Sequence, residues 1–310
     1  MSLAQLRADF ERGTLPKPAY IAAMLEQHRQ LFAYAEHIAG TDIQRIEITQ
    51  QGPVFWLRDM PFRLTCPDGE ARVAPLEILN FRQYEAHEIG LLQSLLGKQT
   101  CALDIGANIG WFALWLAHHL PQATVHAFEP MPQSYQYLSR NIAANGVGSR
   151  VFTYNHGLSN EAGIVDFYVY PTGSTNASML NVSGATDARR VRAMTLTVDE
   201  WCANHEASPD FIKCDVEGAE FLVFKGAQQT LRRCQPLVFT EMLRKWSKPF
   251  GYHPNDVLVY FRGLGYRCLA LSAQGLKPFE AMDDQTVETN FLFLHRDRHA
   301  DVLARVGAGA

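Results

Sequence analysis

The 310-residue sequence lacks the features that mark membrane and secreted proteins. No stretch approaches the run of roughly eighteen apolar residues that a membrane-spanning helix needs. Residues 1–13 carry four charged side chains where a secretory signal peptide would need an apolar segment. We therefore expect a cytoplasmic protein with no membrane span.

Metal-binding and nucleic-acid-binding patterns are also missing. The six cysteines include no Cys-x-x-Cys pair, so the sequence supports neither a zinc site nor a disulfide framework. The formal charge is −4, and no basic cluster goes beyond Arg189–Arg190. A groove that follows nucleic-acid phosphates needs such clusters, so we expect no nucleic-acid partner. Hydrophobic residues make up 47% of the chain, which is enough for a large core.

The most informative stretch is an apolar strand that breaks on glycine and restarts as a helix. The predicted strand Cys101–Ile105 carries Asp104 near its end, and the run Trp111–Ala117 is apolar on all sides. A helix buried under a sheet has that character. Gly106 and Gly110 permit a tight turn and let backbone N–H groups approach a ligand at the positive end of the helix dipole. A nucleotide-like ligand is expected at this break.

The glycine spacing separates this loop from a dinucleotide site. The pattern is Asp-x-Gly-x-x-x-Gly, and Asn108 stands where the dinucleotide fingerprint has its central glycine. A second apolar strand, Thr124–Phe128, ends at Glu129-Pro130, where a carboxylate could accept hydrogen bonds from a ribose diol. A glycine loop followed by an acidic second strand is typical of class I methyltransferases, for which the ligand is S-adenosylmethionine. A nicotinamide oxidoreductase is disfavoured because it would need the missing glycine.

The rest of the chain divides into blocks by its hydrophobic period. Ala4–Gly13 and Pro18–Ile38 have helical spacing, and Ile43–Ile78 alternates as short antiparallel strands. Strands and helices then alternate, which predicts a mainly parallel sheet with helices on both faces. The predicted organisation is a helical and β cap at residues 1–80, an α/β domain at residues 81–300 and a frayed tail at residues 301–310.

Two further segments are placed beside the ligand loop. Asn80–Leu96 is predicted as one helical segment, with Tyr84 and Glu85 able to close over the loop. The insertion Gly163–Leu196 is predicted as two strands flanking a small-polar loop at Thr172–Ser178. We expect it to form a lip that shapes an acceptor site; a surface ornament without a role is the alternative.

Three acids crowd the carboxyl end of another predicted strand. Asp215, Glu217 and Glu220 lie within six positions, at the sheet edge where open parallel sheets bind ligands. Like charges this close raise the proton affinity of at least one group, unless Lys213 or a metal compensates.

Several of these stretches together resemble the FkbM family of methyltransferases, over about Tyr84 to His295: residues 104–110, 128–130, 212–220, 225–227 and 290–293. Members of that family depend on S-adenosylmethionine and mostly methylate hydroxyl groups of sugars or natural products. The resemblance implies an O-methyltransferase with a class I, Rossmann-like, seven-stranded sheet that is mostly parallel and ends in an antiparallel hairpin. Ser174–Leu180 departs from the family's usual Ser-Ser-Leu-like element and leaves the acceptor open.

The expected donor site comprises the glycine loop, the acidic strand end and the loop after the third strand: Asp104, Gly106, Ala107, Asn108, Gly110, Trp111, Glu129, Pro130, Asn155, Gly157, Leu158 and Asp215.

Methyl transfer to a hydroxyl requires an acceptor oxygen about 3 to 3.5 Å from the methyl carbon and a base for its proton. Asp215 or Glu241 is favoured for proton removal or acceptor holding, with Glu217 beside them. His253 is the alternative base, and His156 is the other histidine near the predicted site. A divalent cation bound by these acids ranks second.

Other functions stay open from the sequence alone. A non-catalytic module that binds S-adenosylmethionine, or a methyltransferase with a non-sugar acceptor, would carry the same donor loop. The expected partner is a small-molecule or carbohydrate hydroxyl acceptor, and a homodimer is allowed for.

Overall fold

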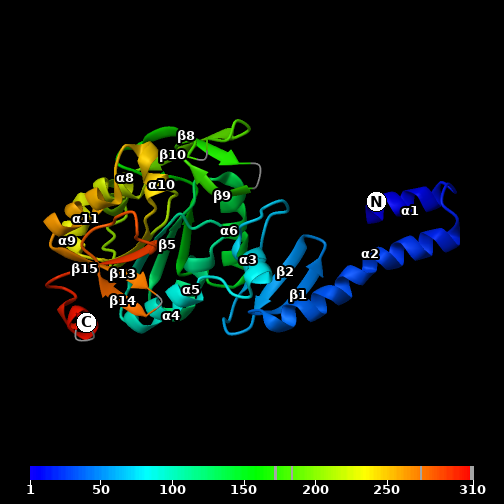
Figure 1. Cartoon of the computed structure of the whole chain (residues 1–310), viewed down its shortest axis with the longest axis horizontal. Coiled ribbons are helices and arrows are strands. Elements are labelled where there is room, and N and C mark those ends of the chain that lie inside the picture. The colour runs from blue at the N-terminus through cyan, green and yellow to red at the C-terminus, as the bar shows by residue number, and fades with distance from the viewer. Residues whose placement is uncertain (171–172, 183, 273, 308–310) are drawn as a thin grey trace.

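A computed structural model describes residues 1–170, 173–182, 184–272 and 274–307 of the chain. Figure 1 shows a large α/β body, a smaller N-terminal sheet beside it and a helical hairpin that projects away from both. No helix in these ranges is both long and apolar enough to cross a membrane.

The body is built on a mixed sheet of eight strands among the described residues. In spatial order they are β14 (Gly275–Pro278), β13 (Tyr266–Ser272), β15 (Asn290–His295), β12 (Leu237–Glu241), β11 (Phe211–Cys214), β4 (Cys101–Ile105), β5 (Thr124–Phe128) and β6 (Val151–Tyr154). The five strands from β12 to β6 are parallel, and β15 is antiparallel to both β12 and β13. The predicted α/β fold with a mostly parallel sheet and an antiparallel hairpin is confirmed. The predicted count of seven strands is wrong because Gly275–Pro278 pairs with β13.

Helices cover both faces of this sheet, so its central strands are apolar on both sides. Ala102 of β4 packs in the cluster that contains α4, α5, α6 and α12, whereas Leu103 packs in the cluster that contains α7, α8, α9 and α11. The helix bounds are α3 Ala74–Phe81, α4 Ala86–Leu95, α5 Trp111–His119, α6 Pro132–Ala144, α7 Val198–Asn204, α8 Glu220–Lys225, α9 Gln228–Cys234, α10 Arg244–Ser247, η2 Lys248–Phe250, α11 Pro254–Gly263 and α12 Ala300–Gly307.

Two helical predictions differ from the structure. The segment Asn80–Leu96 is not one helix: α3 ends at Phe81 and α4 begins at Ala86. Arg82 and Glu85 between them adopt positive φ angles of 77° and 49°, which breaks the helical path. The expected frayed tail is helical as far as Gly307, and residues 308–310 lie outside the described residues.

The N-terminal block contains helices and short antiparallel strands, as predicted. Its elements are α1 Leu3–Glu11, α2 Lys17–His37, η1 Ile38–Gly40, β1 Ile43–Thr49, β2 Gly52–Leu57 and β3 Arg63–Thr65. The three strands form a separate sheet in the order β1-β2-β3. It docks on the body through β3 and α6, where the Thr65 N–H donates to Asn141 Oδ1 at 2.8 Å. Phe62 packs edge-on against Trp111, so this aromatic ring is part of the core.

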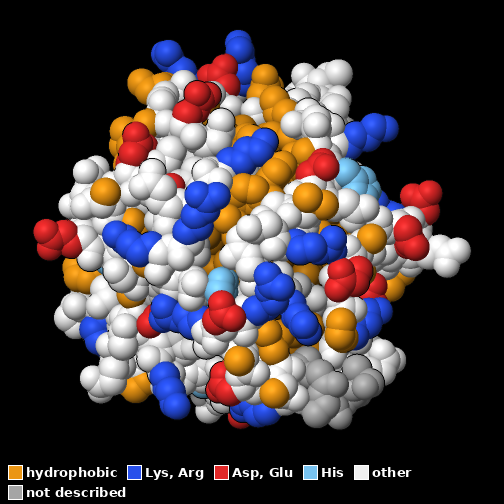
Figure 2. All heavy atoms as spheres, turned by 90° about the vertical axis from the view of Figure 1, so that its left-hand side faces the viewer, with side chains coloured by type: hydrophobic (Ala, Val, Ile, Leu, Met, Phe, Trp, Pro, Cys, Tyr) orange, Lys and Arg blue, Asp and Glu red, His pale blue; other side chains and the backbone are white. Residues whose placement is uncertain are grey.

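The insertion after β6 forms a third sheet in the order β7-β10-β8-β9. Its strands are β7 Gly157–Leu158, β8 Gly163–Tyr170, β9 Gly173–Ser178 and β10 Arg189–Leu196. Much of the stretch predicted as a small-polar loop is the strand β9, and Thr172 lies outside the described residues. This sheet, called the lip from here on, lies at the top of the body in Figure 1. Figure 2 shows the side of the body turned away from the hairpin, where acidic and basic side chains are interspersed.

Candidate active site

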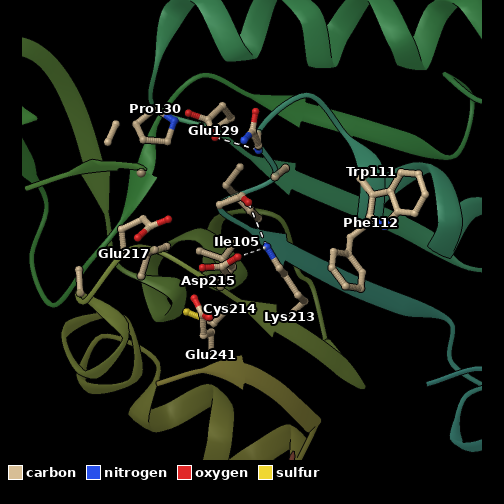
Figure 3. A pocket seen from close by; sticks show the side chains of 18 of the residues that line it. Ile105, Trp111, Phe112, Glu129, Pro130, Lys213, Cys214, Asp215, Glu217 and Glu241 are labelled. Atoms are coloured by element: carbon tan, nitrogen blue, oxygen red, sulfur yellow. Dashed lines mark hydrogen bonds and ion pairs between the residues drawn. The ribbon is translucent and has the colours of Figure 1, made fainter. Parts of the chain in front are cut away.

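A cavity of about 260 Å³ lies at the carboxyl ends of the parallel strands β4, β5, β11 and β12. Its walls come from the glycine loop, the strand ends, the α3–α4 connection and the lip. Figure 3 shows Asp215, Glu217 and Glu241 facing one space, with Glu129 on the opposite side of it. A cavity is therefore present at the sheet edge predicted to bind ligands.

The glycine loop contains one position, Gly106, whose backbone conformation and close surroundings require glycine. Gly106 has φ +80°, and a Cβ there would lie 1.9 Å from the backbone oxygen of Asp215. The ends of β4 and β11 are thus in direct contact through this glycine. Asn108 is also left-handed, with φ 48°, and its N–H donates to Glu129 Oε2 at 2.9 Å. Gly110, which is the N-cap of α5, lies behind the loop against Leu138 and outside the cavity lining.

Glu129 lines the cavity and ties the loop to the second strand. Its Oε1 accepts the Met131 N–H at 2.8 Å while Oε2 accepts that of Asn108. Burial raises the pKa of Glu129 to about 7, and these two backbone donors oppose the rise. A carboxylate oxygen has two acceptor positions, so both oxygens can still accept hydroxyl donors from a ligand. Asn155 does not line the cavity; its amide donates to the backbone oxygen of Glu129 at 2.9 Å and so fixes this strand end.

A buried lysine links the donor loop to the acid at the end of β11. Lys213 Nζ donates to the Gly106 backbone oxygen at 3.1 Å and lies 3.4 Å from Asp215 Oδ2 and 3.7 Å from Asp104 Oδ1. Burial lowers the pKa of the Lys213 ammonium, but the carboxylates of Asp215 and Asp104 outweigh it and hold the pKa above its usual range. Asp104 itself is fully buried beneath the loop and does not line the cavity. Lys213 therefore supplies the positive charge that compensates the neighbouring carboxyl groups of Asp104 and Asp215.

Besides Glu129, three further carboxyl groups in the cavity bind protons more tightly than usual. Burial raises the pKa of Glu241 to about 8, and the neighbouring Asp215 carboxylate contributes to this rise. Burial, with Asp215 and Glu241, holds the pKa of Glu217 well above its usual range. Burial also raises the pKa of Glu85, on the α3–α4 connection, to about 7. The site can therefore hold or accept protons near neutral pH.

Three predicted or neighbouring groups are not brought to the cavity. Glu220 turns inward, where its Oε1 accepts the N–H groups of Val216 and Gly218 at 3.0 and 3.1 Å, so it holds the turn after β11. His253 is the N-cap of α11, and its ring accepts the Asn255 N–H. His156 is buried against Phe128. Neither histidine lines the cavity, so neither is assigned the role of base.

Most of the other residues predicted for the donor site lie along the cavity wall. The donor-site residues that line the cavity are Gly106, Ala107, Asn108, Trp111, Glu129, Pro130, Gly157, Leu158 and Asp215. Tyr84 and Glu85 also line it, as expected for a segment beside the loop. The sequence analysis does not predict Arg72, Glu77 or Asn290 as site residues, although all three line the cavity from distant parts of the chain. No motif marks Arg72 or Glu77, and the family resemblance over residues 290–293 gives Asn290 no role in the site.

Unsatisfied polar atoms indicate where a ligand would bind. The buried Asn108 Oδ1 and Trp111 Nε1, both from cavity-lining residues, have no hydrogen-bond partner among the described residues. Buried polar atoms normally have partners, so these two suit a ligand with its own donors and acceptors. An adenosyl compound provides both, and Glu129 would hold its ribose diol. In the described ranges, no three His, Cys, Asp or Glu side chains are arranged to hold a metal ion.

Comparison with known proteins agrees with this geometry. The family model for the methyltransferase FkbM domain matches residues 104–268, more than half of the chain. The chain belongs to the FkbM methyltransferase family. The matched FkbM region includes the glycine loop, Glu129, Asp215 and Glu241, so most of the cavity lining belongs to an S-adenosylmethionine-dependent methyltransferase domain.

Curated FkbM-like relatives cover parts of the chain. Methyltransferase sdnD of Sordaria araneosa is 30% identical over 181 residues, which are 49% of this chain and 68% of that protein. Hexuronic acid methyltransferase AglP of Haloferax volcanii is 29% identical over 42% of this chain and 50% of its own length. The 31-O-demethyl-FK506 methyltransferase FkbM of Streptomyces tacrolimicus is 36% identical over 33% of this chain. The chain spans 37% of that last protein and half of AglP.

Proposed function

We propose that this protein is an O-methyltransferase that transfers a methyl group from S-adenosylmethionine to a hydroxyl of a sugar, glycoconjugate or natural product. The observation that carries the proposal is the carboxyl group of Glu241, raised to a pKa of about 8, in the same cavity as the glycine loop. A hydroxyl acceptor must lose a proton during transfer, and a base works best when its pKa lies near the working pH.

The donor half of the cavity is assigned to the glycine loop and the end of β5. S-adenosylmethionine supplies a methyl group activated by a sulfonium centre. The loop backbone at Gly106–Asn108 and the carboxylate of Glu129 would hold its adenosyl part. The adenine ring would pack against Gly157 and Leu158. Of the carboxyl groups near Lys213, that of Asp215 lies closest to the Lys213 ammonium. Because the Asp215 backbone oxygen lies against Gly106, this residue connects the donor loop with the acids of the acceptor half.

The acceptor half is assigned to the acids and the lip. Glu241 accepts the proton of the acceptor hydroxyl, and Asp215, whose Oδ2 lies 3.4 Å from Lys213 Nζ, orients that hydroxyl. The acceptor oxygen gains the methyl group as it loses its proton, so charge balances at the acceptor. Phe167 and Met179 of the lip side provide an apolar wall, which suits the apolar face of a sugar or a natural product.

The names of two relatives agree with an oxygen acceptor. AglP is named for hexuronic acid, and FkbM is named for 31-O-demethyl-FK506. Both sugar acids and hydroxylated natural products therefore belong among the acceptors to be tested.

The proposal is tested by transfer of the labelled methyl group from S-adenosylmethionine to panels of hydroxylated acceptors. We expect label in an alkali-stable ether on at least one sugar or hydroxylated natural product. Label recovered only on nitrogen or carbon would refute O-methylation. Tight binding of S-adenosylhomocysteine without transfer to any panel member would favour the non-catalytic binding module.

A further inference from the structure

The hairpin of α1 and α2, called the arm from here on, has almost no core of its own. None of the 21 residues of α2 is buried, and Leu6 is the buried residue of α1. Phe10 and Tyr20 stack with ring centroids 4.5 Å apart and hold the two helices together. Figure 1 shows most of the arm projecting from the body, while the C-terminal end of α2 lies against it, where His37 Nε2 is 2.7 Å from the Leu79 backbone oxygen. Helices in proteins are stabilised mostly by the packing of an apolar face. Between its contacts with α1 and with the body, α2 has no such packing partner among the described residues.

Several exposed side chains of α2 form a mostly apolar stripe along one face of the helix, with the exposed Leu31 beside it and the exposed Tyr34 outside it. Ile21, Leu25, His28, Phe32 and Ala35 follow one another at steps of three or four residues, which places them on one face of the helix. The exposed fractions are 55% for Ile21, 52% for Leu25 and 72% for Phe32. Isolated exposed apolar side chains are common on protein surfaces, but a continuous stripe marks an interaction surface.

The stripe is symmetric about its centre. If two copies of α2 cross antiparallel at His28, Ile21 of one copy faces Ala35 of the other, and Leu25 faces the region of Phe32. The large Ile21 then opposes the small Ala35, and Leu25 and Phe32 pack on either side of the crossing point. A twofold contact of this kind brings each surface patch against itself.

The charges of the arm fit the same arrangement. Residues 1–40 contain four basic and four acidic side chains, so the arm has no net charge: Arg7, Asp9, Glu11, Arg12, Lys17, Glu26, Arg29 and Glu36. A neutral arm favours neither an anionic membrane nor a strongly charged partner. Glu26 and Arg29 form an ion pair with each other at 3.1 Å within α2, so they place no unpaired charge beside the contact.

We propose that the arm is a dimerisation element, in which α2 packs antiparallel on α2 of a second copy of this chain. A 21-residue helix is about 31 Å long and 10 Å across, so half of its surface is on the order of 500 Å². Two copies would then bury about 1,000 Å² in total, the size at which a specific interface becomes plausible. Antiparallel crossing places the two bodies at opposite ends of the paired arms, so neither cavity is covered. The inference is independent of the proposed function.

The first test measures the molar mass of the intact protein by size-exclusion chromatography with light scattering. We expect twice the chain mass of 34.8 kDa for the wild type and the monomer mass for Phe32→Asp. Ile164→Asp is the matched control, because Ile164 is 73% exposed on β8 of the body, and it should stay dimeric. Unchanged binding of S-adenosylhomocysteine by Phe32→Asp would show that the body is still folded.

The second test fixes the geometry by oxidative cross-linking. His28→Cys should form a covalent dimer, because the two copies of residue 28 meet at the twofold axis and disulfides need Cα atoms within about 7 Å. Gln30→Cys, on another face of α2, and the wild type with its native thiols should not. A monomeric wild type, a dimer that survives Phe32→Asp, or equal cross-linking at positions 28 and 30 would overturn the proposal.

Discussion

Replacing Gly106 with alanine should damage the donor site far more than the same change at another left-handed glycine. Gly106 has φ +80°, and its added Cβ would lie 1.9 Å from the Asp215 backbone oxygen. Gly251 has φ +74°, but a Cβ added there would meet nothing within 4 Å, so Gly251→Ala is the matched control. Both variants share the cost of a left-handed alanine, about 1 to 2 kcal/mol.

Only Gly106→Ala adds a steric conflict. To reach an ordinary contact distance, the ends of β4 and β11 would have to part by roughly 1.5 Å, which displaces Asp215 and the loop. A displacement of about 1 Å in a site can cost roughly a hundredfold in rate. We therefore expect at least a tenfold loss of S-adenosylhomocysteine affinity, about 1.4 kcal/mol, for Gly106→Ala and little change for Gly251→Ala.

The assay is isothermal titration calorimetry with S-adenosylhomocysteine, together with thermal unfolding of the free proteins. Gly251→Ala should lower the melting temperature by a few degrees, in proportion to about 1 to 2 kcal/mol. Gly106→Ala should lower it further. If both variants bind the compound like the wild type and melt alike, the contact between the glycine loop and β11 does not support the donor site.

Four further changes test individual groups. Asp215→Asn should abolish turnover while donor affinity changes only a few fold; near-normal turnover would remove Asp215 from the mechanism. The pKa of Glu241 is raised from 4.5 to about 8, so the folded protein binds this proton more tightly than the unfolded protein does. The stability that this proton provides is lost as the pH rises from 4.5 through 8. Glu241→Gln should therefore raise the melting temperature relative to wild type at pH 8.5 but not at pH 5, and equal shifts at both pH values would contradict this assignment. Lys213→Met leaves Asp104 and Asp215 without their cation and should cost about 3 to 5 kcal/mol in denaturant unfolding, whereas the exposed Lys98→Met should cost almost nothing. Methyl transfer should survive incubation with EDTA and dialysis, and a loss that Mg²⁺ or Ca²⁺ restores would argue for a cation among the acids.

The strand ends that line the glycine-loop side of the cavity could be predicted because their signals are local. Gly106, Glu129 and Asp215 each follow directly from an apolar strand, and parallel strands deliver their carboxyl ends to one edge of the sheet. The sequence indicates Lys213 only as a compensating charge. Its burial against Asp104 depends on the pairing of β11 with β4, which the sequence pattern does not specify.

The rest of the cavity could not be predicted because it depends on long-range packing. Arg72 and Glu77 reach the cavity from the N-terminal block, where no motif marks them. Asn290 reaches it from the last strand, and the family resemblance over residues 290–293 does not indicate that this side chain faces the cavity. His253 is a reasonable candidate by its position after β12, but it caps α11 outside the cavity. The additional strand β14 follows from pairing across a turn next to Gly275, which has φ +107°.

The most direct test of the donor site is a crystal structure of the protein with S-adenosylhomocysteine. We predict that the ribose hydroxyls lie within hydrogen-bonding distance of Glu129 and that the sulfur faces Asp215 and Glu241. Binding of the compound elsewhere, or a sulfur turned away from both acids, would contradict the account.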